Sequence, residues 1–285
     1  MSQFISAAEN WLIANTSVPT SQRHALTRIV DQLLHDQTGS CAKIIAISGA
    51  PGTGKSTLAA ACAAALEDDR IRSIVLSLDD YYLPAATREE LSRTEHPLFS
   101  ARGVPGTHDL SLLLTHLNLL ADPDHPDIKI PRFDKSNDDR LEDHRIVKAG
   151  FVPEFIFIEG WVVGVPPQSR GALLSACSKF EQQHDPDAKW RSCVNAYMFD
   201  YFKSLDPILT HRWYLQAPDW ASVIKWRLNQ EISAQQGRLN SRGEVSAFLN
   251  HFQRICDHMQ ATCSQWADVI IQIDADHLPG IVKPT

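Results

Sequence analysis

The residues best suited to chemistry lie in one glycine-rich run. They are Gly49, Ala50, Pro51, Gly52, Thr53, Gly54, Lys55, Ser56 and Thr57. The run matches the pattern G-x-x-x-x-G-K-[ST], whose glycines let backbone N–H groups turn toward phosphate oxygens. An apolar stretch precedes it and an alanine-rich stretch follows, so a helix N-terminus adds positive charge at the anion. Lys55 is expected to reach the β- and γ-phosphates and the Ser56 hydroxyl to bind the metal ion, which predicts ATP and Mg²⁺ as ligands.

A second reactive group is the carboxylate of Asp79, within Leu76-Ser-Leu-Asp-Asp-Tyr-Tyr82. The segment follows an apolar run, so the acid is expected at the carboxyl end of a strand, beside the γ-phosphate. A substrate hydroxyl there can give its proton to Asp79 as it attacks phosphorus. Alternatively, Asp79 or Asp80 caps a helix or holds Mg²⁺ through water, and which of the two is the base stays open.

Basic residues follow in a polar stretch of the chain. Arg102 and His108 lie in Arg102-Gly-Val-Pro-Gly-Thr-His-Asp109 and have no local structural duty, so we expect them to bind substrate or order the loop. Arg132 and Lys135 place two cations just after a predicted strand, an arrangement suited to a substrate carboxylate.

Local structural roles are the alternative for the neighbouring polar residues. Thr107 or Asp109 can N-cap the apolar helix that is expected from Leu110. The charged residues near Lys135 form either a solvated ion-pair cluster or contacts to substrate; they are Asp134, Asp138, Asp139 and Arg140.

The elements that position these groups alternate between strand and helix. Apolar, β-branched runs predict strands at residues 43–48, 74–78, 155–158, 212–215 and 269–273, and helices are expected at 55–67, 110–120, 195–203 and 219–235. Continuous apolar runs suit strands that are covered on both faces. We therefore predict an α/β fold of the P-loop NTPase type, with a three-layer, doubly wound and mostly parallel sheet and ligands at the carboxyl ends of its strands.

The chain is expected to form a single domain over residues 1–285 with three added parts. Two amphipathic helices, at residues 2–15 and from residue 21, make an N-terminal helical extension over 1–40. Residues 80–130 are expected to form a substrate-binding insertion, because residues 79–158 contain only one strand-like fragment, at 128–130. Residues 219–250 form a third part, which the family resemblance described below implies is a helical lid, and residues 182–189 are expected to form a variable surface insertion.

Composition excludes several classes of protein. With 27 basic and 34 acidic residues the formal net charge is −7, which argues against nucleic-acid binding, and there is no basic run that would read anionic lipid. No apolar stretch is long enough to span a membrane. The six cysteines have neither disulfide-framework nor zinc spacing, and the N-terminus is unlike a secretory signal, so a cytoplasmic location is expected. Nothing in the sequence indicates the oligomeric state.

Four motifs occur in the order known from one family: the Leu76–Tyr82 and Arg102–Asp109 segments, Pro131-Arg-Phe-Asp-Lys135, and Ile158-Glu-Gly-Trp161. With the segment Trp226-Arg-Leu-Asn-Gln-Glu231, the chain resembles the P-loop D-glycerate 3-kinase group, which is similar to phosphoribulokinase, uridine kinase and pantothenate kinase. The resemblance covers roughly residues 44–273. It implies ATP-dependent phosphorylation of a hydroxyl of a small molecule, with D-glycerate as the first expectation.

The resemblance also implies roles for single residues. Asp79 matches the catalytic aspartate of the broader group, and Glu159 closes the 155–158 strand where an acid is expected to orient water on Mg²⁺ or the substrate. Arg227 matches a lid arginine that stabilises charge on the transferring phosphoryl group. A turn residue and a surface helix charge are the alternatives for Glu159 and Arg227. Beyond them the lid offers Arg238 and Arg242, which match no assigned position.

Two questions about function stay open at this point. Lys135 and Arg132 favour an anionic acceptor, whereas a nucleoside or a pantothenate-like alcohol is the second choice, with Tyr81 and Tyr82 as the aromatic residues that a base could stack on. The other alternative is a non-catalytic ATP-binding regulatory module.

Overall fold

A central sheet organises the computed structural model, which describes residues 3–37, 42–233 and 241–282. Its helices are α1 (Gln3–Asn15), α2 (Thr20–His35), α3 (Lys55–Asp68), α4 (Ala85–Thr94), α5 (Leu110–Leu120), α6 (Lys179–His184), α7 (Lys189–Leu205), α8 (Trp220–Ser233), α9 (Arg242–Leu249) and α10 (Gln253–Trp266). The strands are β1 (Lys43–Gly49), β2 (Ser73–Ser77), β3 (Ile128–Ile130), β4 (Phe133–Asp134), β5 (Asp139–Arg140), β6 (Arg145–Val147), β7 (Phe155–Glu159), β8 (His211–Gln216), β9 (Val269–Ile273) and β10 (Pro279–Val282).

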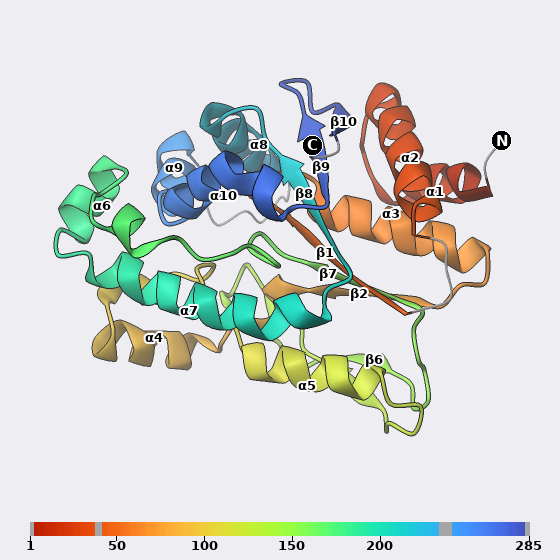
Figure 1. The fold of residues 1–285 in the computed structure, drawn as a ribbon, viewed down its shortest axis with the longest axis horizontal. Coiled ribbons are helices and arrows are strands. Elements are labelled where there is room, and N and C mark those ends of the chain that lie inside the picture. Colours follow the sequence, from red (N-terminus) through yellow and green to blue (C-terminus); the bar gives the residue numbers. More distant parts are fainter. Residues whose placement is uncertain (1–2, 38–41, 234–240, 283–285) are drawn as a thin grey trace.

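Six of these strands form the main sheet in the order β10-β9-β8-β1-β7-β2. Neighbouring strands are parallel except for the antiparallel pair β9 and β10. All five residues of β7 and the last five of β1 are buried, as expected for strands covered on both faces. Figure 1 shows α1, α2 and α3 on one side of the sheet and α7 and α10 on the other. The predicted α/β fold with a mostly parallel sheet between two helical layers is confirmed.

The two N-terminal helices pack on α3, the helix that follows the glycine-rich run. α1 buries Phe4, Ala8 and Leu12, and α2 buries an apolar stripe that includes Leu33 and Leu34. α2 also lies against β10, so the second helix and the last described strand meet beside α3 (Figure 1). The helices predicted at residues 2–15 and from residue 21 are thus present, and both contribute to the core.

The region between β2 and β7 contains more structure than the sequence suggested. The short 3-10 helix η1 (Leu78–Tyr81) follows β2, and α4, α5, the β3–β6 ribbon and the β4–β5 hairpin come after it. The expectation of a single strand fragment was wrong, because β4 and β5 have two residues each and carry no apolar run. α4 escaped notice because it has no apolar stripe; its buried residue is Arg88.

The proposed surface insertion at residues 182–189 is corrected in one respect. Most of it is exposed, but Asp185 is fully buried and accepts hydrogen bonds from the N–H groups of Trp190 and Arg191. A carboxylate at this helix N-terminus satisfies backbone donors that start α7, which therefore begins at Lys189, before the predicted Asn195.

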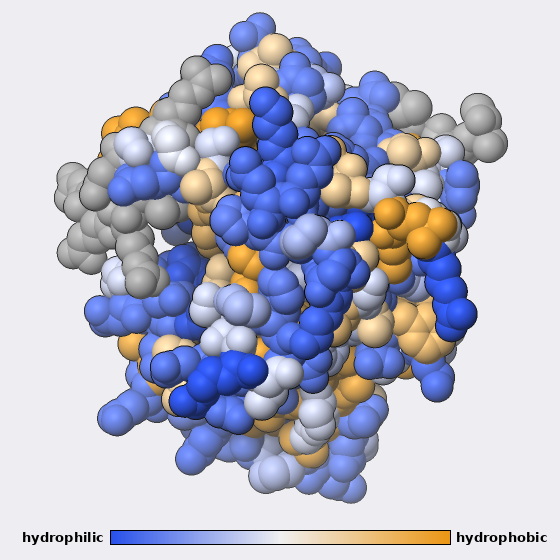
Figure 2. All heavy atoms as spheres, turned by 90° about the vertical axis from the view of Figure 1, so that its left-hand side faces the viewer, coloured by the Kyte–Doolittle hydropathy of each residue, from blue (hydrophilic) through white to orange (hydrophobic). Residues whose placement is uncertain are grey.

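The expected lid region corresponds to α8 and α9. Residues 234–240, with Arg238, lie outside the described residues, as does the side chain of Arg242. Within the described ranges, no helix combines the length and the apolarity needed to cross a membrane. Figure 2 shows that the face on the left of Figure 1 is predominantly hydrophilic, with apolar residues dispersed in small groups.

Candidate active site

The glycine-rich run forms the turn from β1 to α3. Gly52 and Gly54 have φ angles of 87° and 92°, which residues with a Cβ rarely adopt. The N-cap residue of α3 is Gly54, which has no side chain to cap the helix, so the first N–H groups of α3 are available to an anion. Lys55 Nζ donates to the carbonyl oxygen of Ala50 at 3.1 Å. Burial lowers the pKa of Lys55, and the carboxylate of Glu159 opposes this shift.

Glu159, the last residue of β7, lies beside the phosphate loop. The parallel register pairs it with Ser77 at the end of β2. Ser56 Oγ and Ser77 Oγ both donate to Glu159 Oε1, at 2.9 and 2.6 Å. Hydroxyl and carboxylate oxygens are the ligands that Mg²⁺ prefers, and such sites use few protein ligands beside water and phosphate. Ser56 and Glu159 therefore fit a magnesium site; Ser77 was not predicted, since only the strand register brings it here.

Asp79 lies in η1, just past the carboxyl end of β2. Its Oδ1 accepts from Tyr82 Oη at 2.9 Å and its Oδ2 from Lys135 Nζ at 2.6 Å. Burial alone would raise the pKa of Asp79, but the ammonium of Lys135 and the Tyr82 hydroxyl hold it well below its ordinary value. The neighbouring Asp80 has a raised pKa because of burial, and it does not line the cavity that Asp79 faces.

A layer of aromatic and imidazole rings supports Asp79 from below. The Tyr82 ring stacks on His108 with centroids 4.5 Å apart, and His108 Nδ1 lies 3.0 Å from Tyr201 Oη. Burial lowers the pKa of His108 to about 4, so the ring is neutral at pH 7. His108 thus lies under the site and does not line the cavity. Tyr81 is also excluded, because it is fully buried and bonded to His116.

The two predicted acceptor-binding cations separate in the structure. Lys135 lines the cavity, whereas Arg132 is exposed and pairs with Asp143 at 2.8 Å, outside it. Successive side chains of an extended segment point to opposite faces, so Phe133 and Lys135 face inward while Arg132 faces outward. The pairing of Arg132 with Lys135 in one site is therefore corrected. Arg102 takes that place, since it lines the cavity with Lys135.

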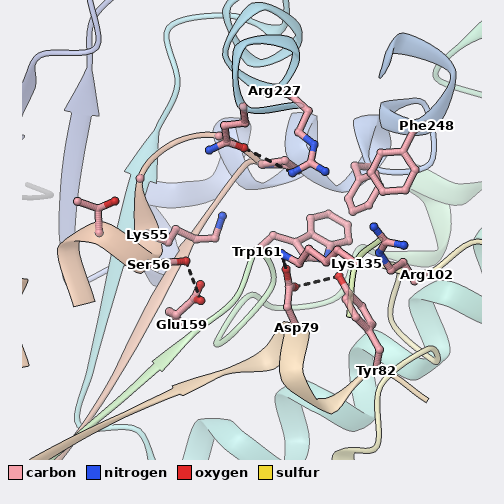
Figure 3. Close-up of a pocket in the computed structure, with 16 residues that line it drawn as sticks. Lys55, Ser56, Asp79, Tyr82, Arg102, Lys135, Glu159, Trp161, Arg227 and Phe248 are labelled. Carbon is pink, nitrogen blue, oxygen red and sulfur yellow. Dashed lines mark hydrogen bonds and ion pairs between the residues drawn. The ribbon is translucent and has the colours of Figure 1, made fainter. Parts of the chain in front are cut away.

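The predicted lid region contributes Arg227, which lies on α8 at the top of the cavity (Figure 3). Its guanidinium forms an ion pair with Glu231 and lies 5.9 Å from the ring centroid of Phe248 on α9. Arg227 Nε is buried and has no hydrogen-bond partner within the described part of the chain. α8 packs on the phosphate loop, since a Cβ on Gly52 would lie 3.1 Å from Trp226 Cβ, and the Arg227 guanidinium is held by the ion pair within its own helix.

Aromatic residues to which the sequence assigned no role complete the cavity. Trp161 Nε1 donates to the carbonyl oxygen of Gly103 at 2.6 Å, and the Trp161 ring meets Phe252 edge to face at 4.7 Å. A Cβ on Gly103 would lie 2.4 Å from Phe252 Cζ, so only glycine fits this contact. No sequence pattern around Phe248 and Phe252 indicates that they line the site, because α9 and α10 reach it only through tertiary packing.

Figure 3 shows the side chains converging on one space, which has a volume of about 170 Å³. Lys55, Ser56 and Glu159 lie on one side, Asp79, Tyr82 and Arg102 on the other, with Arg227 above. A separate, more apolar cavity adjoins the phosphate loop on its other flank. Residues from α2, α3 and the last two strands line it, among them Val18, Leu26, Thr57, Ile273 and His277.

Comparisons with known proteins identify kinases among the relatives of this chain. No family model matches the chain. It is 33% identical over 222 residues to the uncharacterized kinase mug58 of Schizosaccharomyces pombe, covering 73% of this chain and 78% of that protein. It is 28% identical over 220 residues to the chloroplastic D-glycerate 3-kinase of Arabidopsis thaliana, covering 73% and 46% of the two chains.

A solved structure shares the fold. D-glycerate 3-kinase from Cryptococcus neoformans superposes with a TM-score of 0.70, covering 98% of each chain at 20% identity. The phosphate loop with its neighbouring acids, and the relationship to these kinases, establish that the chain belongs to the glycerate kinase-like family of P-loop kinases and is an ATP-dependent small-molecule kinase.

Proposed function

We propose that this kinase transfers the γ-phosphoryl group of ATP to a hydroxyl of D-glycerate. The observation that carries the proposal is the single cavity that joins the phosphate loop to Asp79 and to the cations Arg102 and Lys135. A donor half and an acceptor half for an anionic hydroxy compound thus face each other across one small space. Relatives that are named D-glycerate 3-kinases support this choice of acceptor.

In the proposed donor half, the N–H groups of the loop from Gly49 to Thr57 and the Lys55 ammonium bind the phosphates. Ser56 and Glu159 hold the magnesium ion, which neutralises charge on the phosphates when it is bound. Arg227 supplies a further positive charge to the transferring group when the lid region, residues 219–250, closes over it. Water is thereby kept from the phosphoryl group.

In the proposed acceptor half, Asp79 orients the attacking hydroxyl. A carboxylate with so low a pKa is a weak base, so its contribution is to accept a hydrogen bond and direct the oxygen toward phosphorus. The loose transition state of phosphoryl transfer makes such positioning more important than early proton removal. The proton passes to Asp79 as the new P–O bond forms and the bond to ADP breaks.

Two features favour a small anionic acceptor over a nucleoside. The two tyrosines that were considered as stacking partners for a base are engaged elsewhere, because Tyr81 is in the core and one face of Tyr82 is occupied by His108. The cavity of about 170 Å³ is also below the usual size of sites that enclose larger ligands, roughly 300–1,000 Å³. Arg102 and Lys135 offer the carboxylate two cationic donors.

The apolar cavity beside the phosphate loop is proposed as the site of the adenine base. It borders Gly54 and Thr57, so a nucleotide whose phosphates lie in the loop can extend into it. Val18 and Leu26 of the N-terminal extension, residues 1–40, form one wall. The extension would thereby act in ATP binding, within one kinase domain over residues 1–285 whose residues 80–130 form the acceptor insertion.

The proposal is tested by measuring ADP release with ATP, Mg²⁺ and single acceptors: D-glycerate, L-glycerate, uridine, pantothenate and none. We expect D-glycerate to stimulate release, with the phosphorylated position identified by phosphorus NMR of the product. Stimulation by uridine or pantothenate alone would refute the choice of acceptor. Slow release that no acceptor stimulates would favour the regulatory module instead.

A further inference from the structure

One hairpin brings both acceptor-side cations to the cavity. β4 and β5 are joined by residues 135–138, and this four-residue loop carries Lys135 at its start and Asp138 at its end. Lys135 itself contacts Asp79, while Asp138 forms an ion pair with Arg102. The positions of both cations relative to Asp79 therefore depend on the same loop.

Asp138 accepts hydrogen bonds from a buried arginine. Arg88 of α4 is 1% exposed, and its Nη1 donates to Asp138 Oδ2 at 3.3 Å and to the Ser100 carbonyl at 3.0 Å. Arg88 Nη2 donates to the backbone carbonyl of Asp138 at 2.5 Å. Both the carboxylate and the backbone of the loop end are thus attached to α4. A buried charge of this kind is costly to leave without its partner.

The Phe133 ring packs against both arginines that contact Asp138. The guanidinium carbons of Arg88 and Arg102 lie 5.9 and 5.6 Å from its centroid, within the range of cation–π contact. Asp138 has a φ of 59°, a left-handed conformation that aspartate adopts at some cost. Such a conformation persists where surrounding contacts enforce it, and it is common beside functional sites.

Strand β5 of the hairpin is hydrogen-bonded to the segment that follows Asp79. Arg140 Nε donates to the Tyr82 carbonyl at 2.7 Å, and Asp139 Oδ1 accepts from the N–H of Ala85 at 3.0 Å. The loop therefore cannot shift relative to Asp79 without breaking these bonds. Attachment at both ends is what a rigid support for an active-site group requires.

We propose that Asp138 and Arg88 are positioning residues for acceptor recognition. Together they fix Arg102 and Lys135 so that the carboxylate of a hydroxy acid is bound between the two cations. This inference rests on the proposed function, which it deepens by assigning the acceptor's charge to a defined support. Neither residue touches the acceptor.

The test uses Asp138→Asn, because asparagine tolerates the left-handed conformation at least as well as aspartate and keeps the side-chain shape. The loss of the carboxylate leaves Arg88 buried without its charge partner, so the loop end shifts and carries Lys135 and Arg102 with it. We expect KM for D-glycerate to rise about tenfold to a hundredfold, the effect of losing a charge-assisted hydrogen bond, with KM for ATP unchanged. Asp143→Asn, which breaks an exposed ion pair outside the cavity, is the matched control.

The decisive readout is the preference for D-glycerate over glycerol, which lacks the carboxylate. A general loss of structure would lower activity with both, whereas a positioning role lowers the preference alone. Arg88→Lys, which keeps the charge but not the forked donors, is expected to act in the same direction. Thermal unfolding of each variant reports whether the fold is retained.

Binding of D-glycerate is measured in parallel by calorimetry with a non-hydrolysable ATP analogue, so the result does not depend on turnover. If another hydroxy acid is the acceptor, the choice of D-glycerate fails, and the same comparison is made with that acid and its alcohol. The inference is overturned if the wild type binds no acid of the panel or prefers the uncharged alcohol. It is also overturned if Asp138→Asn changes KM for the acid less than about twofold, the ordinary effect of a surface substitution.

Discussion

Replacing Tyr82 by phenylalanine tests how Asp79 is held. The substitution deletes the hydroxyl that donates to Asp79 Oδ1 at 2.9 Å. The remaining ring keeps its stacking on His108 and its edge-to-face contact with Phe133, 4.9 Å between centroids. The fold and the cavity wall should therefore be preserved. What is lost is one of the two bonds that orient the carboxylate.

The structure limits the size of the effect. A hydrogen bond to a charged group contributes about 1.5–3 kcal/mol. The Asp79 side chain is 31% exposed and keeps its bond to Lys135, so water can partly replace the hydroxyl and the lower value applies. A loss of about 1.5 kcal/mol corresponds to roughly a tenfold fall in kcat/KM for the acceptor. KM for ATP should not change, because Tyr82 lies on the acceptor side.

Steady-state ADP release at varied acceptor concentration measures this. Tyr214→Phe, which deletes a tyrosine hydroxyl on β8 outside the cavity, is the matched control. A fall of more than about a hundredfold would mean that the hydroxyl itself contacts the reacting groups. A change below about twofold would show that this bond does not orient Asp79 in the working enzyme.

Five other substitutions probe the rest of the site. Lys55→Ala should abolish phosphoryl transfer while circular dichroism stays native, and full activity would contradict the assignment of the loop. Asp79→Asn should lower kcat by roughly 10²-fold or more, and a fall below about threefold would demote Asp79 to a structural role. Arg102→Ala should raise KM for D-glycerate at least tenfold or so, and Arg132→Ala less than about twofold; a comparable rise with Arg132→Ala would restore the prediction that Arg132 binds the acceptor. His108→Gln should make the free energy of unfolding fall less steeply as the pH is lowered. The pKa of His108 is about 4 in the folded protein and 6.5 in the unfolded chain, so the unfolded chain binds the proton first as the pH falls. Protonation of His108 therefore lowers the free energy of unfolding between pH 6.5 and pH 4, by about 3 kcal/mol in all. Urea unfolding of both proteins at pH 7 and pH 4.5 measures this, and parallel curves would refute it.

The parts of the site that carry a local signal were predictable. The glycine-rich run has its own pattern, and buried parallel strands show as apolar runs, so Asp79 and Glu159 could be placed at strand ends. The carboxyl ends of parallel strands share one edge of the sheet, which is why these distant acids could be expected together. The helices with apolar stripes, such as α5, were predictable for the same reason.

The remaining parts depend on tertiary packing. The outward position of Arg132 follows from the alternation of side chains next to a hairpin whose strands are too short to show a pattern. Ser77 reaches Glu159 through the strand register, and Phe252 reaches Gly103 through the packing of α10. α4 was hidden because its inward residue is an arginine, whose buried charge no hydrophobic periodicity can reveal.

The place of β1 in the sheet has a consequence for how the protein is made. β1 carries the phosphate loop, yet its two neighbours, β7 and β8, begin at residues 155 and 211. A ribosome therefore releases the complete loop sequence long before either flanking strand exists. Long-range pairings of this kind form slowly, and the backbone N–H and C=O groups along both edges of β1 stay unpaired until they do. We expect the nascent chain to gain nucleotide affinity only late in synthesis, after β8 has left the exit tunnel.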